Sequence, residues 1–378
     1  MEAILISGIF LSGFIVVLLL TKKQKSLTDK ILTAWLTIIG IHLLGFYYKQ
    51  TGYWEIYPHL IGITAPFPLL HGPMLFLYTL YSLRNDRNIR KIDYLHFAPV
   101  VASYIYMFNF FFFYNAKEKK MVDAGEINDY HIFSIVLLVA ILISGLSYSI
   151  LSYRLTIRHQ KKIDNYFSYH DGINIKWLRN CILAIGLVFL SATIIYFIRD
   201  AYGIQFSFNA DYIIYKVLIG FVFYIGYFGI KQENIFSNNP QLFTTSEEEI
   251  KSEAKYANSG LKGEIVTKLY SKLLKTMADE KPYLDPKLSL PDLARLMEIS
   301  PNQLSQIINQ EAKVNFHDFV NNYRVEEFIN RATTNKKYSL LALALDSGFN
   351  SKSSFNTIFK KQKGVTPSQY LSNQKIKA

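Results

Sequence analysis

Residues 343–370 read LALDSGFNSKSSFNTIFKKQKGVTPSQY and contain the clearest structural pattern in the chain. A short apolar segment with the small residue Ala344 comes first, and Ser351, a good N-cap, follows a turn. After Ser351, apolar residues recur at the i, i+3 and i+4 spacing of a helix: Phe355, Ile358 and Phe359. We therefore predict a helix-turn-helix unit, in which the two helices cross closely at the alanine.

A second copy of this pattern lies earlier in the chain. Ala294 takes the place of the small residue, Ser300 that of the N-cap, and Pro301 suits a first helical position. The apolar residues that follow have the same spacing: Leu304, Ile307 and Ile308. The sequence thus predicts two units, at about residues 289–310 and 339–362.

Residues 316–331 connect the two units. Their apolar positions have helical spacing, which predicts one amphipathic helix that holds the units apart. Because the helical repeat of B-DNA is ~34 Å, such a spacer could place both second helices in successive major grooves. Arg324 on this helix is expected to pair with an acid of the second unit rather than with a phosphate.

The second helix of each unit has an outer face of polar residues. In the first unit these are Asn302, Ser305 and Gln306. In the second unit they are Lys352, Ser353, Asn356, Thr357, Lys360 and Lys361. Amide and hydroxyl groups read base edges and lysines hold phosphates, whereas a single polar face usually just meets water. Two such faces favour double-stranded DNA as the partner.

With these residues, the stretch at about 261–370 resembles the AraC/XylS-type DNA-binding domain. The most specific motifs are SGFNSKSSFN at 347–356, FKK at 359–361 and GVTPSQY at 364–370. The resemblance implies a seven-helix domain that inserts two recognition helices into adjacent major grooves. Position by position, it points to Asn302, Ser305 and Gln306 in the first recognition helix and to Lys352, Ser353, Asn356 and Thr357 in the second. Glu298 departs from the pattern, because this turn often has Gly or Asn, and we expect a first turn that is strained or differently shaped.

The N-terminal part of the chain has a different character. Seven apolar stretches each approach the ~20 residues that a membrane-spanning helix needs. They are Ile4–Leu20, Ile31–Tyr47, Ile61–Leu83, Tyr94–Tyr114, Ile132–Tyr153, Trp177–Ile198 and Tyr212–Ile230. The expected fold is therefore all-α, with a seven-helix transmembrane bundle at 1–231 followed by a soluble all-α domain.

Basic residues predict the orientation of this bundle. The first, third and fifth connections are rich in Lys and Arg, and bases mark the cytoplasmic side. The N-terminus is then outside, 232–262 is a cytoplasmic linker, and 263–378 is a cytoplasmic DNA-binding domain. This order resembles that of membrane-bound AraC-type regulators of some bacteria, which implies the bacterial cytoplasmic (inner) membrane and lipid contacts.

The third apolar stretch is interrupted by Pro66, Pro68 and Pro73, and His71 lies in its middle. Broken helices either serve packing or line a ligand cavity, so His71 is a candidate ligand-binding residue, with a packing kink the favoured alternative. The other histidines are scattered and Cys181 is the single cysteine, so no metal site is expected. We expect no cofactor and no enzymatic activity, because no nucleotide-binding or metalloprotease motif occurs.

Together these patterns predict a membrane-anchored, sequence-specific transcription regulator. Its transmembrane domain would sense a small-molecule or envelope signal, and a homodimer is compatible with this scheme. One alternative is a transporter or lipid-modifying membrane enzyme that carries a regulatory DNA-binding domain. Another is a linker that is cut to release a soluble regulator.

Overall fold

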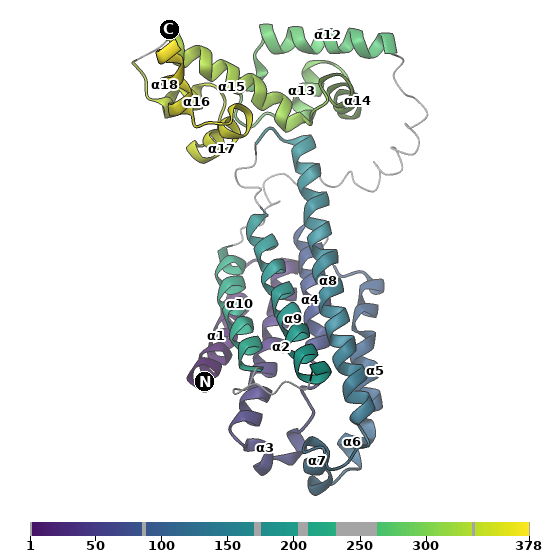
Figure 1. The fold of residues 1–378 in the computed structure, drawn as a ribbon. Coiled ribbons are helices and arrows are strands. Elements are labelled where there is room, and N and C mark those ends of the chain that lie inside the picture. The colour runs from purple at the N-terminus through teal and green to yellow at the C-terminus, as the bar shows by residue number, and fades with distance from the viewer. Residues whose placement is uncertain are drawn as a thin grey trace. The chain divides into compact units, whose positions relative to one another are not determined.

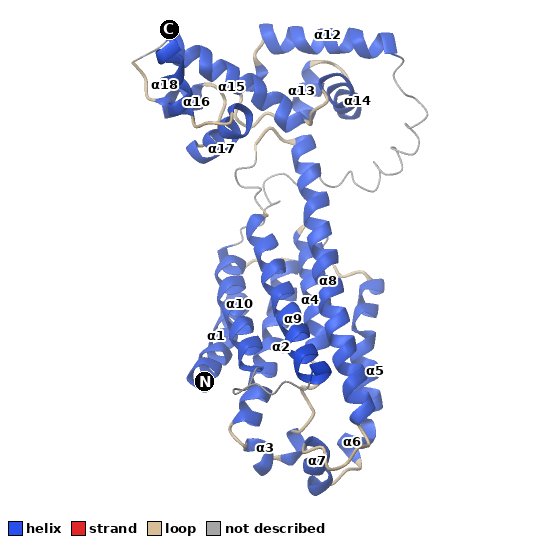
Figure 2. Ribbon diagram, viewed as in Figure 1, coloured by secondary structure: helices blue, strands red, loops and turns tan. Residues whose placement is uncertain are grey.

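The computed structural model describes residues 2–84, 88–169, 175–202, 211–231, 263–334 and 337–377. These residues form helices, turns and one isolated antiparallel bridge between Phe167 and Ser289, so the all-α prediction is confirmed (Figure 2). The chain divides into two compact units. One comprises Met1–Ile157 with Ile175–Thr244, and the other Arg158–Asn174 with Thr245–Ala378. The expected linker at 232–262 lies outside the described residues.

Within the described residues of the N-terminal unit, five helices are long and apolar enough to cross a membrane (Figure 1). They are α1 (Glu2–Thr21), α2 (Leu27–Gln50), α8 (His131–Tyr166), α9 (Lys176–Tyr202) and α10 (Asp211–Lys231). All five coincide with predicted apolar stretches. Large apolar side chains such as Phe10 and Ile132 are more than 70% exposed along these helices. Exposing such large apolar side chains to water is unfavourable, whereas contact with the hydrocarbon of a lipid bilayer carries no such cost.

The third and fourth predicted stretches form shorter helices instead. Turns occupy 61–67, and α4 (Pro68–Ser82) has 15 residues, or about 22 Å at 1.5 Å per residue. Proline lacks the N–H that a continuing helix needs, which explains why α4 begins at Pro68. The fourth stretch consists of η2 (Lys91–Phe97), α5 (Ala98–Tyr106) and α6 (Phe108–Phe112). Neither stretch is a single helix of spanning length.

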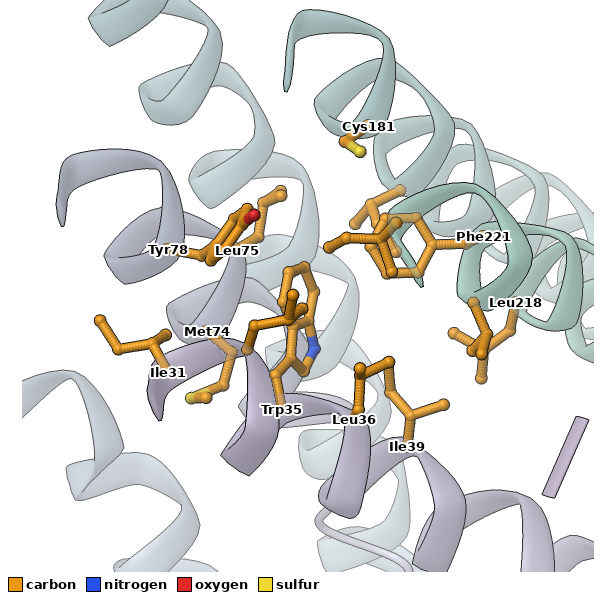
Figure 3. Packing of buried hydrophobic residues seen from close by; sticks show 14 of the residues in the cluster. Ile31, Trp35, Leu36, Ile39, Met74, Leu75, Tyr78, Cys181, Leu218 and Phe221 are labelled. Carbon is orange, nitrogen blue, oxygen red and sulfur yellow. The ribbon is translucent and has the colours of Figure 1, made fainter. Parts of the chain in front are cut away.

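The core of the N-terminal unit surrounds Trp35 on α2. This helix packs against α1, α4 and α10. The Trp35 side chain is fully buried, with ring centroids 6.2 Å from Tyr78 on α4 and 5.2 Å from Phe221 on α10 (Figure 3). Tilted aromatic pairs at these distances contribute roughly 0.5–1.5 kcal/mol each beyond the area that they bury. Trp35 therefore joins three helices from distant parts of the sequence.

The C-terminal unit contains two small cores on one shared helix, α15 (Phe316–Thr334). The first core involves α12 (Gly263–Asp279), η4 (Pro282–Leu284), α13 (Leu290–Leu296), α14 (Pro301–Ile307) and η5 (Ile308–Ala312). The second involves α16 (Leu340–Asp346), α17 (Lys352–Lys363) and α18 (Pro367–Lys377). The predicted spacer helix is thus present, and each helix-turn-helix unit packs on one part of it.

The predicted N-caps of the second helices are confirmed. The Ser300 side chain accepts the backbone N–H of Gln303 at the start of α14, and the Ser351 side chain accepts that of Ser354 at the start of α17. Each cap satisfies a backbone donor that the helix leaves unpaired, which stabilises the helix by about 1 kcal/mol. These serines therefore fix where each second helix begins.

The turns of the two units use different residues at one equivalent position, four residues after the small alanine. Glu298 has a φ of 59° and Gly348 a φ of 89°. A Cβ on Gly348 would lie 2.2 Å from the carbonyl oxygen of Tyr283, so only glycine fits there. Glu298 is exposed and meets no such clash, but it adopts a backbone conformation that disfavours side chains. The strained first turn expected from the sequence is confirmed.

Replacing Glu298 with glycine should therefore stabilise the protein by about 1 kcal/mol, because glycine adopts positive φ without strain. The measurement is the thermal midpoint of the full chain in detergent micelles. Glu311→Gly is the matched control, because Glu311 is exposed but helical, and glycine should destabilise there by about 0.5–1 kcal/mol. Equal losses in both variants would contradict this account of the turn.

Candidate nucleic-acid interface

The helix α17 separates apolar and polar residues onto opposite faces. Phe355, Ile358 and Phe359 are buried, and the rings of Phe355 and Phe359 lie 4.5 and 5.6 Å from that of Phe328 on α15. The predicted polar residues of this helix are all exposed: Lys352, Ser353, Asn356, Thr357, Lys360 and Lys361. The first five follow each other at i, i+1, i+4, i+5 and i+8, so they share one face. Helix α17 thus presents amides, hydroxyls and ammonium groups together on that face.

The first unit presents a smaller polar face. On α14, Asn302 is exposed, whereas Ser305 and Gln306 are half-buried. The Asn309 amide donates to Ser305 Oγ at 3.3 Å, so this hydroxyl already has a partner. Beyond Ile307 the helix widens into the π-helical turn η5, which ends at Lys313 with a φ of 55°. Sequence reasoning missed the π-turn, because helical spacing alone does not reveal one inserted residue.

Two lysines of α17 connect this helix to α15. Lys361 Nζ lies 2.8 Å from Asp318 Oδ1, and Lys363 Nζ lies 2.6 Å from Glu326 Oε1. The hydrogen bond from His317, followed by that from Lys361, holds the pKa of the Asp318 carboxyl well below its usual range. Lys360 differs, because among the described residues no carboxylate pairs with it. Lys360 is therefore the better candidate for a phosphate contact.

Arg324 on α15 does not have the acidic partner expected from the sequence. Its side chain is 1% exposed, and the Nε–H donates to the carbonyl oxygen of Tyr283 at 2.8 Å. The other N–H groups donate to the carbonyl of Asp285, to Asn321 and to Ser168. Burial lowers the Arg324 pKa to about 10, which still leaves the group charged at neutral pH. Arg324 is thus buried in the domain, and its side chain is not accessible to a DNA phosphate.

The structure also shows where His71 lies in the N-terminal unit. Trp35 Nε1–H donates to His71 Nδ1 at 3.3 Å, and His71 Nε2 lies 3.1 Å from His42 Nδ1. His42 Nε2 lies 3.2 Å from the Tyr215 hydroxyl. Because indole is only a donor, His71 Nε2 must carry the proton that it gives to His42. The two histidines are 29 positions apart in the sequence, and no spacing pattern signalled this pairing.

This hydrogen-bonded chain borders a cavity of about 480 Å³. His42, His71 and Tyr215 contribute polar atoms to its wall, and apolar residues such as Phe189 contribute most of the rest. Lys49 and Asp123 also line the cavity, and their charged groups lie 3.5 Å apart. A volume in this range suits a small organic molecule.

Comparison with known proteins agrees with the geometry of the C-terminal unit. Residues 293–373 match the family model of the helix-turn-helix domain. The chain is also similar to the uncharacterized transcriptional regulatory protein YesN of Bacillus subtilis (strain 168), with 29% identity over 106 residues. That similarity covers 28% of this chain and 28% of the relative, so the chain spans little more than a quarter of the protein that it matches. No solved structure is significantly similar to the chain.

Replacing Asn356 with alanine should relax base preference by about 1–3 kcal/mol at one base pair, because an exposed amide of a recognition helix reads base edges. The measurement is a comparison of affinities for single-base-pair variants of the selected DNA. Asn330→Ala, at an exposed position of α15 outside both second helices, is the control and should change nothing. An unchanged preference in the Asn356 variant would contradict this role.

Replacing Lys360 with alanine should weaken binding evenly across sequences and reduce the slope of log affinity against log salt by about 1. A changed base preference would show that α17 is wrongly placed on the DNA.

Lys361→Ala should have a different main effect, because Lys361 already holds Asp318. A carboxyl whose pKa is depressed by folding adds stability above its unfolded pKa of ~3.9, and this is lost as pH falls further. The variant should therefore be less stable than the unsubstituted protein at pH 7, with a difference that shrinks below about pH 4. The measurement is the thermal midpoint of the variant and of the unsubstituted protein at pH 7 and below about pH 4. A difference between the two proteins that does not depend on pH would contradict this role of Lys361.

The paired capped turns, the shared α15 and the family match at 293–373 together identify the C-terminal part of this chain as an AraC-type helix-turn-helix domain.

Proposed function

We propose that this protein is a membrane-anchored, sequence-specific DNA-binding transcription regulator that senses a signal through its N-terminal unit. The observation that carries the proposal is the polar face of α17. Five residues that suit base and phosphate contacts share this exposed face, opposite an apolar face that fixes the helix on α15. A similar, smaller face on α14 supplies the second contact that AraC-type domains are expected to make.

The membrane anchor is supported by the apolar exterior of the N-terminal unit and by its basic connections. We propose a transmembrane domain at 1–231, with the N-terminus outside, a linker at 232–262 and a cytoplasmic DNA-binding domain at 263–378. Lys22 of the first connection lies 3.0 Å from Asp29 near the start of α2, the end of this helix that the orientation places inside. The bacterial cytoplasmic membrane is the location that fits this orientation.

We infer that the cavity beside His71 receives the signal. In the proposed orientation α2 ends outside, so Lys49 and Asp123 lie at the outer end of the cavity and His42 lies deeper. The hydrogen-bonded series from Tyr215 through His42 and His71 reaches Trp35 on α2, whose ring packs against side chains of α4 and α10. A small molecule that displaces Tyr215 or His42 would therefore disturb the core around Trp35. A signal taken up at the outer face would change helix packing in this way.

The central experiment uses the full chain in lipid nanodiscs and selects binding sequences from a random duplex library. The expected result is a single enriched motif, recovered at physiological salt and present upstream of regulated genes. Deletion of the gene should change transcription of those genes. Binding without sequence preference would contradict the proposed function.

Replacing His71 with leucine should leave the Trp35 N–H and His42 without their buried partner. An unsatisfied buried polar group costs about 1–3 kcal/mol, so the variant should have a lower thermal midpoint in micelles. It should also alter reporter output from the selected motif while leaving the affinity of the protein for DNA unchanged. The control is Lys161→Gln, an exposed position that should affect neither measurement. A normal reporter response in the leucine variant would remove His71 from the sensing scheme.

A further inference from the structure

The C-terminal unit contains a segment from the middle of the chain, residues 158–169, which we call the docking segment. It comprises the end of α8 and the residues that follow this helix. Ile163, Phe167 and Ser168 are at most 3% exposed, although they belong to a connection that the sequence predicts to be a loop. Phe167 forms the antiparallel bridge with Ser289, the N-cap residue of α13. One side of the docking segment is therefore buried in the domain.

Ser168 makes the polar contacts of this segment. Its Oγ–H donates to the carbonyl oxygen of Leu288 at 2.6 Å, and its N–H donates to the same oxygen at 3.3 Å. Its carbonyl oxygen accepts from Asn321 Nδ2 at 2.9 Å and from an Arg324 N–H at 3.0 Å. A second Arg324 N–H donates to Ser168 Oγ at 3.0 Å. All atoms of Ser168 that can form hydrogen bonds are thus used inside the C-terminal unit.

The contact with Arg324 lies where the two helix-turn-helix units meet. Arg324 also binds the carbonyl oxygens of Tyr283 and Asp285, which precede the first unit. From the other side, a Cβ on Gly348 in the turn of the second unit would lie 3.0 Å from Arg324 Nε. Asn350 of the same turn donates to the Pro286 carbonyl at 2.9 Å. The docking segment therefore completes the hydrogen bonds of the residue that joins both units.

The segment does not block the polar faces of the recognition helices. Asn302 on α14 and Asn356 on α17 are exposed, as are Lys352 and Lys360. An inhibitory segment that covered the DNA-binding surface would bury some of these side chains. The position of the segment instead fits a device that sets the arrangement of the two units.

The docking segment begins within α8, a helix whose earlier residues belong to the N-terminal unit. Helix α8 has 36 residues, about 54 Å at 1.5 Å per residue, whereas a hydrocarbon layer is ~30 Å thick. Its residues up to Ile157 belong to the N-terminal unit and those from Arg158 to the C-terminal unit. One continuous helix therefore supplies side chains to both units, independently of the predicted linker at 232–262.

We propose that the docking segment couples the two halves of the protein: docked on Arg324 and Asn321, it holds both helix-turn-helix units in the arrangement that binds two adjacent half-sites. A shift of α8 in the membrane withdraws Ser168 and leaves two donors of the buried guanidinium unpaired. The two helix-turn-helix units then lose their fixed arrangement, and the affinity of the protein for DNA with both half-sites falls. This coupling rests on the proposed function.

The test uses the full chain in nanodiscs with Ser168→Leu, because leucine is much larger than this buried serine and lacks the hydroxyl that contacts Leu288 and Arg324. Hydrogen exchange should rise in peptides that cover 163–169 and 283–289. Affinity for the selected DNA should fall about tenfold, whereas affinity for a duplex with one half-site randomised should stay the same. Ser168→Ala, which removes only the hydroxyl, covers the case in which leucine prevents folding, and should lower double-site affinity about threefold. Lys161→Gln, on the exposed side of the same helix end, is the matched control.

Each contrary outcome identifies the step that fails. Unchanged exchange in the leucine variant would show that the segment is not docked in the protein. Raised exchange with unchanged double-site affinity would show that docking does not set the arrangement of the units. Equal losses for double and single sites would indicate general damage and overturn the coupling. If the unsubstituted protein lacked sequence preference, the proposed function would fail, together with the effect on DNA, while the exchange experiment would still decide whether the segment docks.

Discussion

The arrangement of the C-terminal unit depends on the hydrogen bonds of the buried Arg324 guanidinium. A buried positive charge costs several kcal/mol unless hydrogen bonds replace its water. Here the five N–H groups of the side chain make five hydrogen bonds, to Tyr283, Asp285, Asn321 and twice to Ser168. These partners come from three separate segments of the chain, so the charge is satisfied only when all three are in place. One buried cation thereby makes the arrangement of these segments cooperative.

The spacing between α14 and α17, the second helices of the two helix-turn-helix units, depends on this arrangement. Their N-caps are local and fix where each helix begins, but no local interaction fixes the distance between α14 and α17. That distance is set by α15, which forms part of both cores, and by the contacts of its buried arginine with the turn at Gly348. Two DNA contacts with a defined spacing require such a rigid connection, because the grooves of the duplex have a fixed repeat.

The N-terminal unit uses polar groups differently. Its helices meet through apolar and aromatic side chains around Trp35, and the hydrogen-bonded chain of His71, His42 and Tyr215 leads from that core to the cavity. If this unit spans a membrane, as proposed, each of these polar groups needs a partner within the protein. A ligand that competes for one member would change the partners of the others. The same property makes the cluster both a packing element and a suitable place for sensing.

The sequence by itself determined the helices, their caps and the two helix-turn-helix units, because these follow from local spacing and from residues such as Ser300, Ser351 and Gly348. It also indicated the apolar stretches, although one of them is shortened because α4 begins only at Pro68. The tertiary structure alone decided the pairing of His42 with His71, the burial of Arg324 without an acid, and the contact of Ser168 with that arginine. These contacts join residues that lie far apart in the chain, and neither spacing nor composition records which distant polar groups will satisfy each other once both are removed from water.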